Sequence, residues 1–387
     1  MNLSLLEGAE VSWFRELSGA RGAAAALARR MGLDEQRAGQ VALAVSEAAT
    51  NLSRHAVDGA ILLRAVRGSE QAGVELVAVD SGPGMSNVPD AMLDGSSSAG
   101  TLGIGLGAVA RLADVFDIHS LPGRGTVLAA RFWPRSSAEQ AAGGRARSTE
   151  PVVDGLTRPI SGEQQCGDAW AARLDDGRPA SDAGTPVEVP RVQRPGAVDW
   201  ASLTATRSAS TGWPAPQPGE GTAVLVMLCD GLGHGPLAAR AAEAAVRAFR
   251  DSRSTMPEQA IQEVHQALRG TRGAAVAVAR IEPQTRRLLF CGVGNIAATL
   301  IGPDSRVGLM SHPGIVGHQM RSMRTFEQPL SPGSALVMHT DGLTERWSPS
   351  ALPGLLLHSP VVMAGQLLRE AGIRHDDAGV VVAKGFW

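Results

Sequence analysis

The chain of 387 residues contains no tyrosine and a single lysine, Lys384, so 35 of its 36 basic residues are arginines. Because Lys384 lies near the C-terminus and follows no glycine-rich loop, the chain cannot carry the lysine of a Walker A motif. The same absences exclude the phosphate-binding lysine of protein kinases, a Schiff-base lysine and a tyrosine general acid. Any phosphate chemistry in this protein must therefore use backbone amides, metal ions or arginines.

Cysteines and long apolar runs are also scarce. Cys166, Cys229 and Cys291 are far apart and form no CxxC pair, which argues against a disulfide framework or a zinc site and favours buried free thiols. No apolar run approaches the roughly 18 residues of a spanning helix, and the first residues lack the basic start of a signal peptide. The net charge of −2 gives no attraction to nucleic acid or to anionic membranes. We therefore expect a cytoplasmic protein that binds neither nucleic acid nor membrane.

Composition divides the chain into two ordered parts. Residues 1–133 and 164–387 contain regularly spaced apolar positions, and each part is long enough to bury a core of its own. The segment 134–163 is rich in Ser, Ala, Gly, Arg and Pro and is predicted to be a flexible linker. A second Pro/Ser-rich stretch, at about 176–221, is predicted to be an insertion within the second part.

The first ordered part predicts an α+β sandwich. Asp34 has the position of an N-cap, and the helix that follows it to about residue 55 carries a stripe of apolar residues that includes Val41 and Val45. A second helix is predicted at about 106–113. Together with the predicted strands, this order favours helices on one face of a mixed sheet. The strands are predicted at 60–66, 74–79, 115–118 and 126–132.

The second ordered part predicts a larger α+β sandwich. Short apolar strands and amphipathic helices follow one another, and we expect two sheets packed face to face. The strands are predicted at 224–228, 274–279, 287–291, 297–301, 335–339 and 379–383, and the helices at 236–250, 257–269 and 361–371.

One side of the first helix gathers polar groups. Glu47, Asn51 and His55 are spaced four residues apart, so they share a side of the helix away from its apolar stripe. A carboxylate and a carboxamide one turn apart can orient a water molecule and ligate a hard cation such as Mg²⁺. Taken alone, the pair is more typical of a solvated helix face.

Two glycine-rich turns change that interpretation. The segment 80–84 (DSGPG) follows a predicted strand, so the Asp80 carboxylate can face a ligand while the glycines admit close backbone approach. The segment 100–107 (GTLGIGLG) opens a predicted helix, where free N–H groups favour a phosphate. Because this turn does not follow the first strand of a βαβ unit, a dinucleotide site is not expected.

These three motifs together resemble the Bergerat ATP-binding fold of gyrase, histidine kinases and MutL, and their short form resembles the RsbT branch of the anti-sigma-factor serine kinases. The resemblance implies that Asn51 holds Mg²⁺, that Glu47 acts as a base or positions a nucleophile, and that Asp80 binds the adenine amino group of ATP. It also implies a lid over the nucleotide at 84–101. The remaining cofactor-binding positions that it implies are Gly82, Gly84, Gly103, Gly105 and Gly107.

The second ordered part carries four aspartates at strand ends or turns, namely Asp168, Asp230, Asp341 and Asp376. An Asp-Gly pair after a strand is usually a turn, so each aspartate alone has a structural explanation. Four of them with apolar flanks instead suggest carboxylates that converge, which suits Mg²⁺ or Mn²⁺. Two such ions can activate a water molecule and offset the charge of a phosphoryl group.

The surrounding motifs, DGLGHG at 230–235, GVGN at 292–295, GIVG at 314–317 and HTDGL at 339–343, resemble the SpoIIE-like branch of the metal-dependent PPM serine/threonine phosphatases. The resemblance implies an α-β-β-α sandwich that binds two Mn²⁺ or Mg²⁺ ions. In it, Asp230 bridges the metals, the Gly231 carbonyl binds one of them, and Asp168, Asp341 and Asp376 complete the ligands. Asp377 is a less favoured ligand. His234 is open between ordering the turn and transferring a proton.

These resemblances predict a two-domain regulator in a sigma-factor partner-switching or stressosome pathway. The C-terminal domain would hydrolyse phosphoserine or phosphothreonine on an anti-sigma antagonist of the STAS type, and the N-terminal domain would bind ATP and phosphorylate such a protein. The alternative for the N-terminal domain is a binding module that does not phosphorylate and in which nucleotide regulates the phosphatase. A homodimer is compatible with either hypothesis. The absence of a histidine before His55 argues against a sensor histidine kinase.

Overall fold

The computed structural model describes residues 7–68, 71–92, 105–135, 152–175, 222–320, 323–373, 375–385 and 387. The insertion predicted at about 176–221, the centre of the predicted linker, much of the predicted lid and Gly103 lie outside these ranges. No helix within the described ranges is long and apolar enough to cross a membrane.

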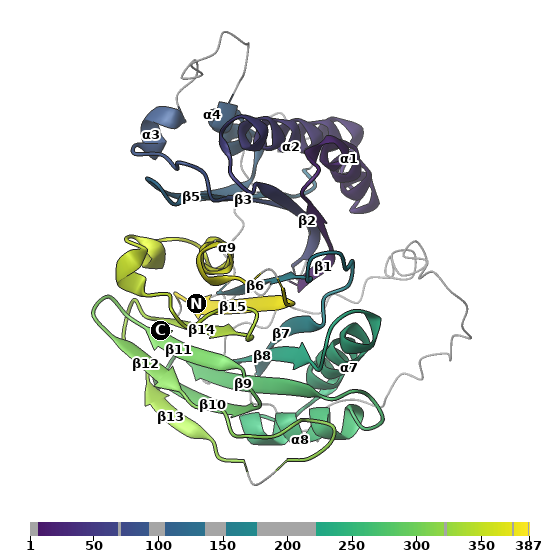
Figure 1. The fold of residues 1–387 in the computed structure, drawn as a ribbon, viewed down its shortest axis with the longest axis vertical. Coiled ribbons are helices and arrows are strands. Elements are labelled where there is room, and N and C mark those ends of the chain that lie inside the picture. Colours follow the sequence, from purple (N-terminus) through teal and green to yellow (C-terminus); the bar gives the residue numbers. More distant parts are fainter. Residues whose placement is uncertain are drawn as a thin grey trace, which may run out of the picture.

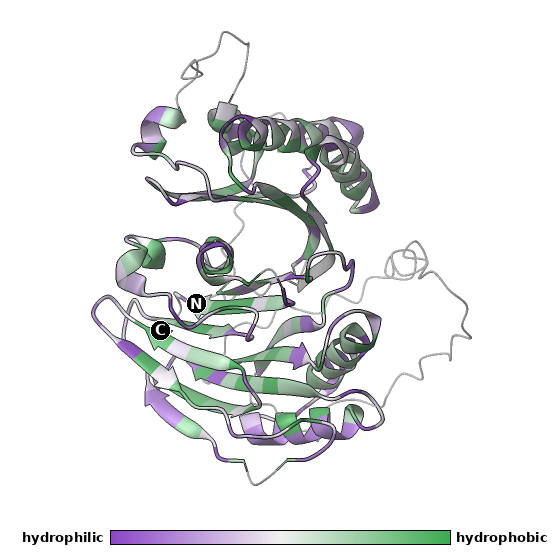
Figure 2. Cartoon of the chain, viewed as in Figure 1, coloured by the Kyte–Doolittle hydropathy of each residue, from purple (hydrophilic) through white to green (hydrophobic). Residues whose placement is uncertain are grey.

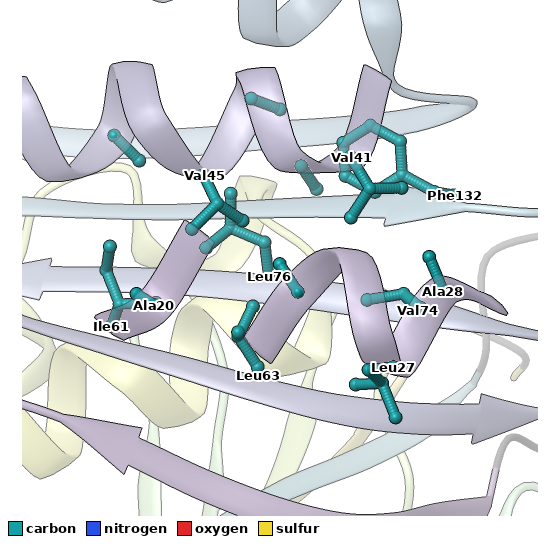
Figure 3. Packing of buried hydrophobic residues seen from close by; sticks show 14 of the residues in the cluster. Ala20, Leu27, Ala28, Val41, Val45, Ile61, Leu63, Val74, Leu76 and Phe132 are labelled. Carbon is teal, nitrogen blue, oxygen red and sulfur yellow. The ribbon is translucent and has the colours of Figure 1, made fainter. Parts of the chain in front are cut away.

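The N-terminal domain is a five-stranded sheet with helices on one face (Figure 1). The helix α2 (Glu35–His55) begins as predicted, because the Asp34 side chain accepts a hydrogen bond from the Arg37 backbone N–H at 2.7 Å. Val41 and Val45 of α2 point at Leu76 and Phe132 of the sheet (Figure 3). The other elements are β1 (Glu7–Phe14), α1 (Ala20–Arg30), β2 (Ala60–Arg67), β3 (Ala72–Asp80), α3 (Val88–Ala91), α4 (Gly105–Leu112), β4 (Val115–Leu121) and β5 (Gly125–Phe132).

The strand order in this sheet is β1-β2-β3-β5-β4, and every neighbouring pair runs antiparallel. The expectation of a mixed sheet was therefore wrong. The reason is that β2–β3 and β4–β5 are each joined directly along the chain, and a short connection leaves its two strands antiparallel.

The C-terminal domain contains two five-stranded sheets packed face to face (Figure 1). One has the order β13-β10-β9-β8-β7 and is covered by α7 and α8; the other has the order β12-β11-β14-β15-β6 and is covered by α9. The α-β-β-α sandwich predicted from the sequence is confirmed. In Figure 2 the strands of the stacked sheets are largely hydrophobic, whereas the outer strand β13 is largely hydrophilic. The elements are β6 (Val153–Arg158), β7 (Asp168–Asp175), β8 (Ala223–Gly231), α7 (Pro236–Asp251), α8 (Pro257–Ala267), β9 (Ala274–Glu282), β10 (Arg287–Val293), β11 (Ala297–Ile301), β12 (Arg306–Leu309), β13 (Phe326–Pro329), β14 (Ala335–His339), α9 (Pro360–Ala371) and β15 (Ala378–Lys384).

The strand β6 lies inside the segment 134–163 that was predicted to be a linker. It pairs antiparallel with β15 at the edge of the second sheet. Its sequence, VDGLTR, offers only two large apolar residues beside an aspartate and a glycine, both of which are depleted in strands. The linker prediction was therefore too long at its C-terminal end, because pairing with β15 overrides the weak local preference.

The helix α9 is shared between the two domains. It is buried along nearly its whole length. On one side it packs against the sheet β12-β11-β14-β15-β6, and on the other against the face of the N-terminal sheet that α1 and α2 leave open (Figure 1). Gly365 marks the close approach, since a Cβ there would lie 2.7 Å from Cγ1 of Val127 on β5. The N-terminal sheet is thus covered on both faces, and the two domains share one hydrophobic core.

A row of buried charges also joins the domains. Arg64, Glu75 and Arg131 are cross-strand neighbours on β2, β3 and β5, on the sheet face that meets the other domain. Both guanidinium groups bind Asp154 of β6, at 2.6 Å from Arg64 and 2.5 Å from Arg131. Burial alone would lower the pKa of Arg64, but the charges of Asp154 and Glu75 raise it. All four side chains are buried, and each is paired with a side chain of the opposite charge type.

Candidate nucleotide and carboxylate sites

The turn after β3 packs against the end of α2. The Ser81 backbone N–H donates to the Val57 carbonyl at 2.8 Å, and a Cβ on Gly82 would lie 2.6 Å from the His55 carbonyl oxygen. The Asp80 carboxylate accepts the Gly82 backbone N–H at 2.7 Å. Only glycine at position 82 allows the helix and the turn to approach so closely, which brings the motif of residues 80–84 to the helix that carries Glu47 and Asn51.

The polar groups of this first site are half-buried. Burial raises the pKa of Asp80, while the Gly82 N–H and the charge of Arg369 oppose the rise. The Asn51 Nδ2 is buried and has no hydrogen-bond partner among the described residues. A buried amide without a partner is costly, and a bound ligand or water would satisfy it. Asn51 and Asp80 therefore fit the polar contacts that a nucleotide needs.

The described glycines of this site stand where a side chain would collide or where the backbone has a positive φ. Gly84 has φ +64°, and a Cβ there would lie 2.0 Å from the Leu121 carbonyl oxygen. A Cβ on Gly107, in the first turn of α4, would lie 2.3 Å from the Met92 carbonyl oxygen. Gly105 has φ +61° and opens the helix. The place of Gly103 lies outside the described residues, so its predicted phosphate contact is untested.

The second site is built around two carboxylates that face each other across a strand pair. Asp168, the first residue of β7, lies directly opposite Asp230 near the end of β8. Burial, followed by the charges of Asp341 and Asp376, raises the pKa of Asp230 to about 7. Burial and the charge of Asp230 also raise the pKa of Asp168. The structure thus brings four of the predicted metal ligands into one electrostatic cluster.

Two neutral side chains orient this carboxylate cluster. The Thr340 hydroxyl donates to Asp168 at 2.7 Å and accepts the Gly379 backbone N–H at 2.9 Å. The Asn295 amide donates to Asp341 at 2.6 Å. The sequence showed Asn295 in a motif and Thr340 beside Asp341, but it gave neither a role, because their partners are distant along the chain.

Asp377 differs from its neighbour Asp376. Both of its carboxylate oxygens accept backbone N–H groups, one from Ile160 and one from Gly167, each at 2.7 Å. Asp377 is 3% exposed and therefore anchors the segment that follows β6. Both oxygens of Asp377 are therefore already used as hydrogen-bond acceptors within the protein.

His234 lies on the exposed side of the turn between β8 and α7. Its Nδ1 is 3.5 Å from a Glu163 carboxylate oxygen, and 58% of its side chain is exposed. The guanidinium of Arg272 lies over the same turn, since a Cβ on Gly233 would be 2.8 Å from its Nη1. An exposed arginine over the turn that follows Asp230 was not predicted from the sequence.

The described carboxylates, thiols and imidazoles include no group of three arranged tightly enough to hold an ion as they stand. The carboxylates instead lie close in pairs, with Asp230 in hydrogen-bonding contact with Asp168 and with Asp341. A proton shared between such carboxylates relieves their mutual repulsion, whereas burial, followed by the charges of Asp341 and Asp376, raises the pKa of Asp230. A divalent cation that replaces the proton is the natural partner of this oxygen-only donor set.

Comparison with known proteins gives separate matches for the two domains. Residues 14–132 match the histidine kinase-like ATPase domain family, and residues 220–384 match the stage II sporulation protein E (SpoIIE) family. The serine/threonine-protein kinase RsbT of Bacillus subtilis (strain 168) is 35% identical over 109 residues, which are 28% of this chain and 82% of RsbT. The phosphoserine phosphatase RsbX of the same organism is 28% identical over 124 residues, which are 31% of this chain and 61% of RsbX.

Among solved structures, RsbX in complex with magnesium aligns with a TM-score of 0.43 and 20% identity, over 59% of this chain and 92% of that chain. The chain spans less than two thirds of the curated RsbX sequence but most of RsbT. Each matched range lies within one of the two domains, and each matched family agrees with the resemblance drawn from the motifs of that domain.

Proposed function

We propose the function of this chain from the family to which it belongs. By its N-terminal domain it is a member of the RsbT family. The chain joins this histidine kinase-like ATPase domain to a SpoIIE-family phosphatase domain of the PPM type. The C-terminal domain, which begins with β6 (Val153–Arg158), hydrolyses phosphoserine or phosphothreonine on a protein. The single observation that carries the proposal is the cross-strand pair of Asp168 and Asp230, with Asp341 in contact.

The carboxylate cluster fits two Mn²⁺ or Mg²⁺ ions. Asp230 would bridge them, the Gly231 carbonyl and Asp168 would bind beside it, and Asp341 and Asp376 would complete the set. The ions, when bound, would activate water for attack on phosphorus. The protein's own contribution is to hold the carboxylates. Thr340 and Asn295 each donate a hydrogen bond that fixes one carboxylate oxygen, and the other oxygen of each carboxylate would be available to an ion.

The N-terminal domain, at about 1–133, binds ATP with Mg²⁺. Asp80 would accept a hydrogen bond from the adenine amino group, and Asn51 would ligate Mg²⁺. Glu47 would act as base or position the nucleophile. The glycines at 82, 84, 103, 105 and 107 would let the backbone approach the nucleotide closely. The buried Nδ2 of Asn51, which has no hydrogen-bond partner among the described residues, supports a bound nucleotide, because it could donate to a ligand oxygen while Oδ1 would ligate the ion. Such a domain can phosphorylate a serine without a lysine, because glycine N–H groups hold the phosphates.

The substrate is a phosphorylated STAS-type antagonist or a related regulator, in a partner-switching or stressosome pathway in the cytoplasm. Support comes from the combination of two domains whose relatives are named as a serine/threonine kinase and a phosphoserine phosphatase. A protein that carries both sites can set the phosphorylation state of one partner in either direction.

Hydrolysis of a phosphoserine peptide tests the phosphatase. We expect Mn²⁺-dependent release of phosphate by the full chain and a loss of at least a hundredfold in Asp230→Ala. The matched control is Asp251→Ala, an exposed aspartate at the end of α7, which should keep the activity. Hydrolysis that persists in Asp230→Ala would refute the metal assignment.

A nucleotide-gated binding module is the second candidate, and the shared helix α9 favours it, because one face of the ATP-binding sheet packs directly on the phosphatase. Glu47→Ala distinguishes the two. A kinase variant should still bind ATP by calorimetry but no longer phosphorylate a STAS-domain protein, as measured by mass spectrometry. A gating module should not phosphorylate the protein at all. ATP should still change its phosphatase rate in Glu47→Ala. Unchanged ATP binding in Asp80→Asn would sink both.

A further inference from the structure

A cavity lies between the two domains, at the edge of the N-terminal sheet. Its volume is about 350 Å³, and both domains line it. Trp13 of β1 and Val79 of β3 come from the ATPase domain, and the segment 158–163 and Leu368 of α9 come from the other domain. We call it the interdomain pocket. Its size and its place between domains are typical of small-molecule sites.

The interdomain pocket opens on the opposite face of the sheet from the proposed nucleotide site, although the charge of Arg369 in its lining opposes the rise that burial causes in the pKa of Asp80. Successive side chains of a strand point to opposite faces, so Val79 and Asp80 face different sides of the sheet. Ala78 packs with the helices α1 and α2, whereas Val79 packs with α9. Asp80 therefore faces the helical side, and the pocket opens on the other.

Positive charge predominates in the interdomain pocket. Arg15, Arg158 and Arg369 line it, against two carboxylates, Asp58 and Glu163, and Arg369 also pairs with Glu370 at 3.2 Å. The Glu163 carboxylate lies against His234 and Gly235, towards the carboxylate site. Guanidinium groups recognise phosphate oxygens with paired hydrogen bonds. The Trp13 side chain is half-buried, and it offers an apolar surface beside Val79 and Leu368.

One wall of the pocket is the segment that supports the carboxylate site. After β6, the Ile160 and Gly167 N–H groups hold both oxygens of Asp377, and Glu163 contacts the turn that follows Asp230. The same segment is tied to the N-terminal domain, because the Trp13 indole N–H donates to the Thr157 carbonyl at 2.8 Å. A molecule in the pocket would therefore touch the backbone that positions Asp377.

We propose that the interdomain pocket binds a small organic phosphate monoester, and that its occupancy changes the rate of the carboxylate site. The excess of guanidinium over carboxylate groups suits a dianion, and the apolar wall suits an organic group attached to it. The second half of the proposal rests on the proposed phosphatase function, whereas the first half stands without it.

Calorimetry with AMP tests the binding. The protein is the full chain carrying Asp80→Asn, which disables the nucleotide site, treated with EDTA so that no metal occupies the carboxylates. We expect AMP to bind, inorganic phosphate to bind more weakly, and Arg15→Ala to weaken AMP binding at least tenfold. Arg21→Ala, an exposed arginine on α1, is the matched control and should bind AMP as before. Absence of AMP binding, or AMP binding unchanged by Arg15→Ala, would overturn the proposal.

The effect on rate is measured separately, with Mn²⁺ and a phosphoserine peptide. AMP should change the rate at least twofold in Asp80→Asn and leave the rate of Asp80→Asn with Arg15→Ala unchanged. A rate that AMP leaves unchanged despite binding would refute the regulatory half. If the wild-type chain hydrolyses no peptide at all, the proposed phosphatase function fails, while calorimetry still decides the pocket.

Discussion

The two faces of the N-terminal sheet are buried in different ways. The face under α1 and α2 is covered mainly by apolar residues such as Leu63 and Leu76, and the buried ion pair on that side, Arg37 with Asp114, lies entirely within the N-terminal domain. The opposite face also buries leucine and valine, but it adds the charged row of Arg64, Glu75 and Arg131, closed by Asp154. An apolar face packs against any complementary helix, whereas a buried charge accepts only a partner that supplies the opposite charge. The first face therefore makes a domain, and the second selects one particular neighbour.

Removing the Asp154 carboxylate should cause the largest loss of unfolding free energy at the face that carries the buried charges. Asp154→Ala leaves Arg64 and Arg131 buried with only Glu75 between them, and breaking a buried ion pair costs about 3–5 kcal/mol. Urea unfolding of the full chain measures the loss. Asp304→Ala, an exposed aspartate, is the control and should change little. A loss below about 1 kcal/mol would show that water replaces the carboxylate and that the row does not select the partner.

Adjacent leucines on opposite faces sharpen the comparison. Leu62 and Leu63 are both fully buried neighbours on β2, but Leu62 packs towards α9 and Leu63 towards the helices. Each replacement by alanine should cost about 2–5 kcal/mol of unfolding free energy. Only Leu62→Ala should also increase hydrogen exchange in α9. Equal exchange of α9 in the two variants would contradict independent faces.

Acid should weaken the contact between the second face of the N-terminal sheet and the start of α9, with a smaller loss of unfolding free energy than these substitutions. Asp117 of β4 accepts hydrogen bonds from the Ser359 backbone N–H at 2.7 Å and hydroxyl at 2.6 Å, at the start of α9. Burial opposes the shift, but His358 and Ser359 lower the pKa of Asp117 to about 2.

Because the folded pKa is lower than the unfolded one, this stabilisation is present above about pH 4 and is lost as the pH falls towards 2. It amounts to about 2 kcal/mol. Asp117→Asn should lose this amount at pH 7 and should show a smaller decline than wild type between pH 5 and 3 in urea titrations. Parallel pH curves for the two proteins would rule out the contribution.

The two faces of the N-terminal sheet differ in how much of their packing can be predicted from the sequence. The stripe of Val41 and Val45 repeats with the helical period, so the helical face of the sheet could be predicted locally. Arg64 and Glu75 occur in strands whose period permits either a solvated or a buried face. Their partner Asp154 is 90 residues from Arg64 along the chain, in a segment that composition marks as linker. Local patterns carry no information about a partner so distant.

The candidate sites show the same limit. Asp80, Asp230 and Asp341 stand in motifs where glycine neighbours reveal them, and their convergence could be expected from the resemblances. Thr340 bonds to Asp168 across 172 residues, and no pattern near either residue predicts the contact. The anchoring of Asp377 by the segment after β6 was equally hidden, because it uses backbone N–H groups, which every residue but proline carries.

The shared helix α9 has a consequence for how this protein can be divided. Its apolar surface is matched on one side by residues before position 135 and on the other by residues after position 152, so the covalent connection is not what holds the halves together. Either half made alone would expose an apolar face to water, and the two made as separate chains would be expected to reassemble. The contact between the halves therefore resembles the apolar interface between the subunits of a heterodimer.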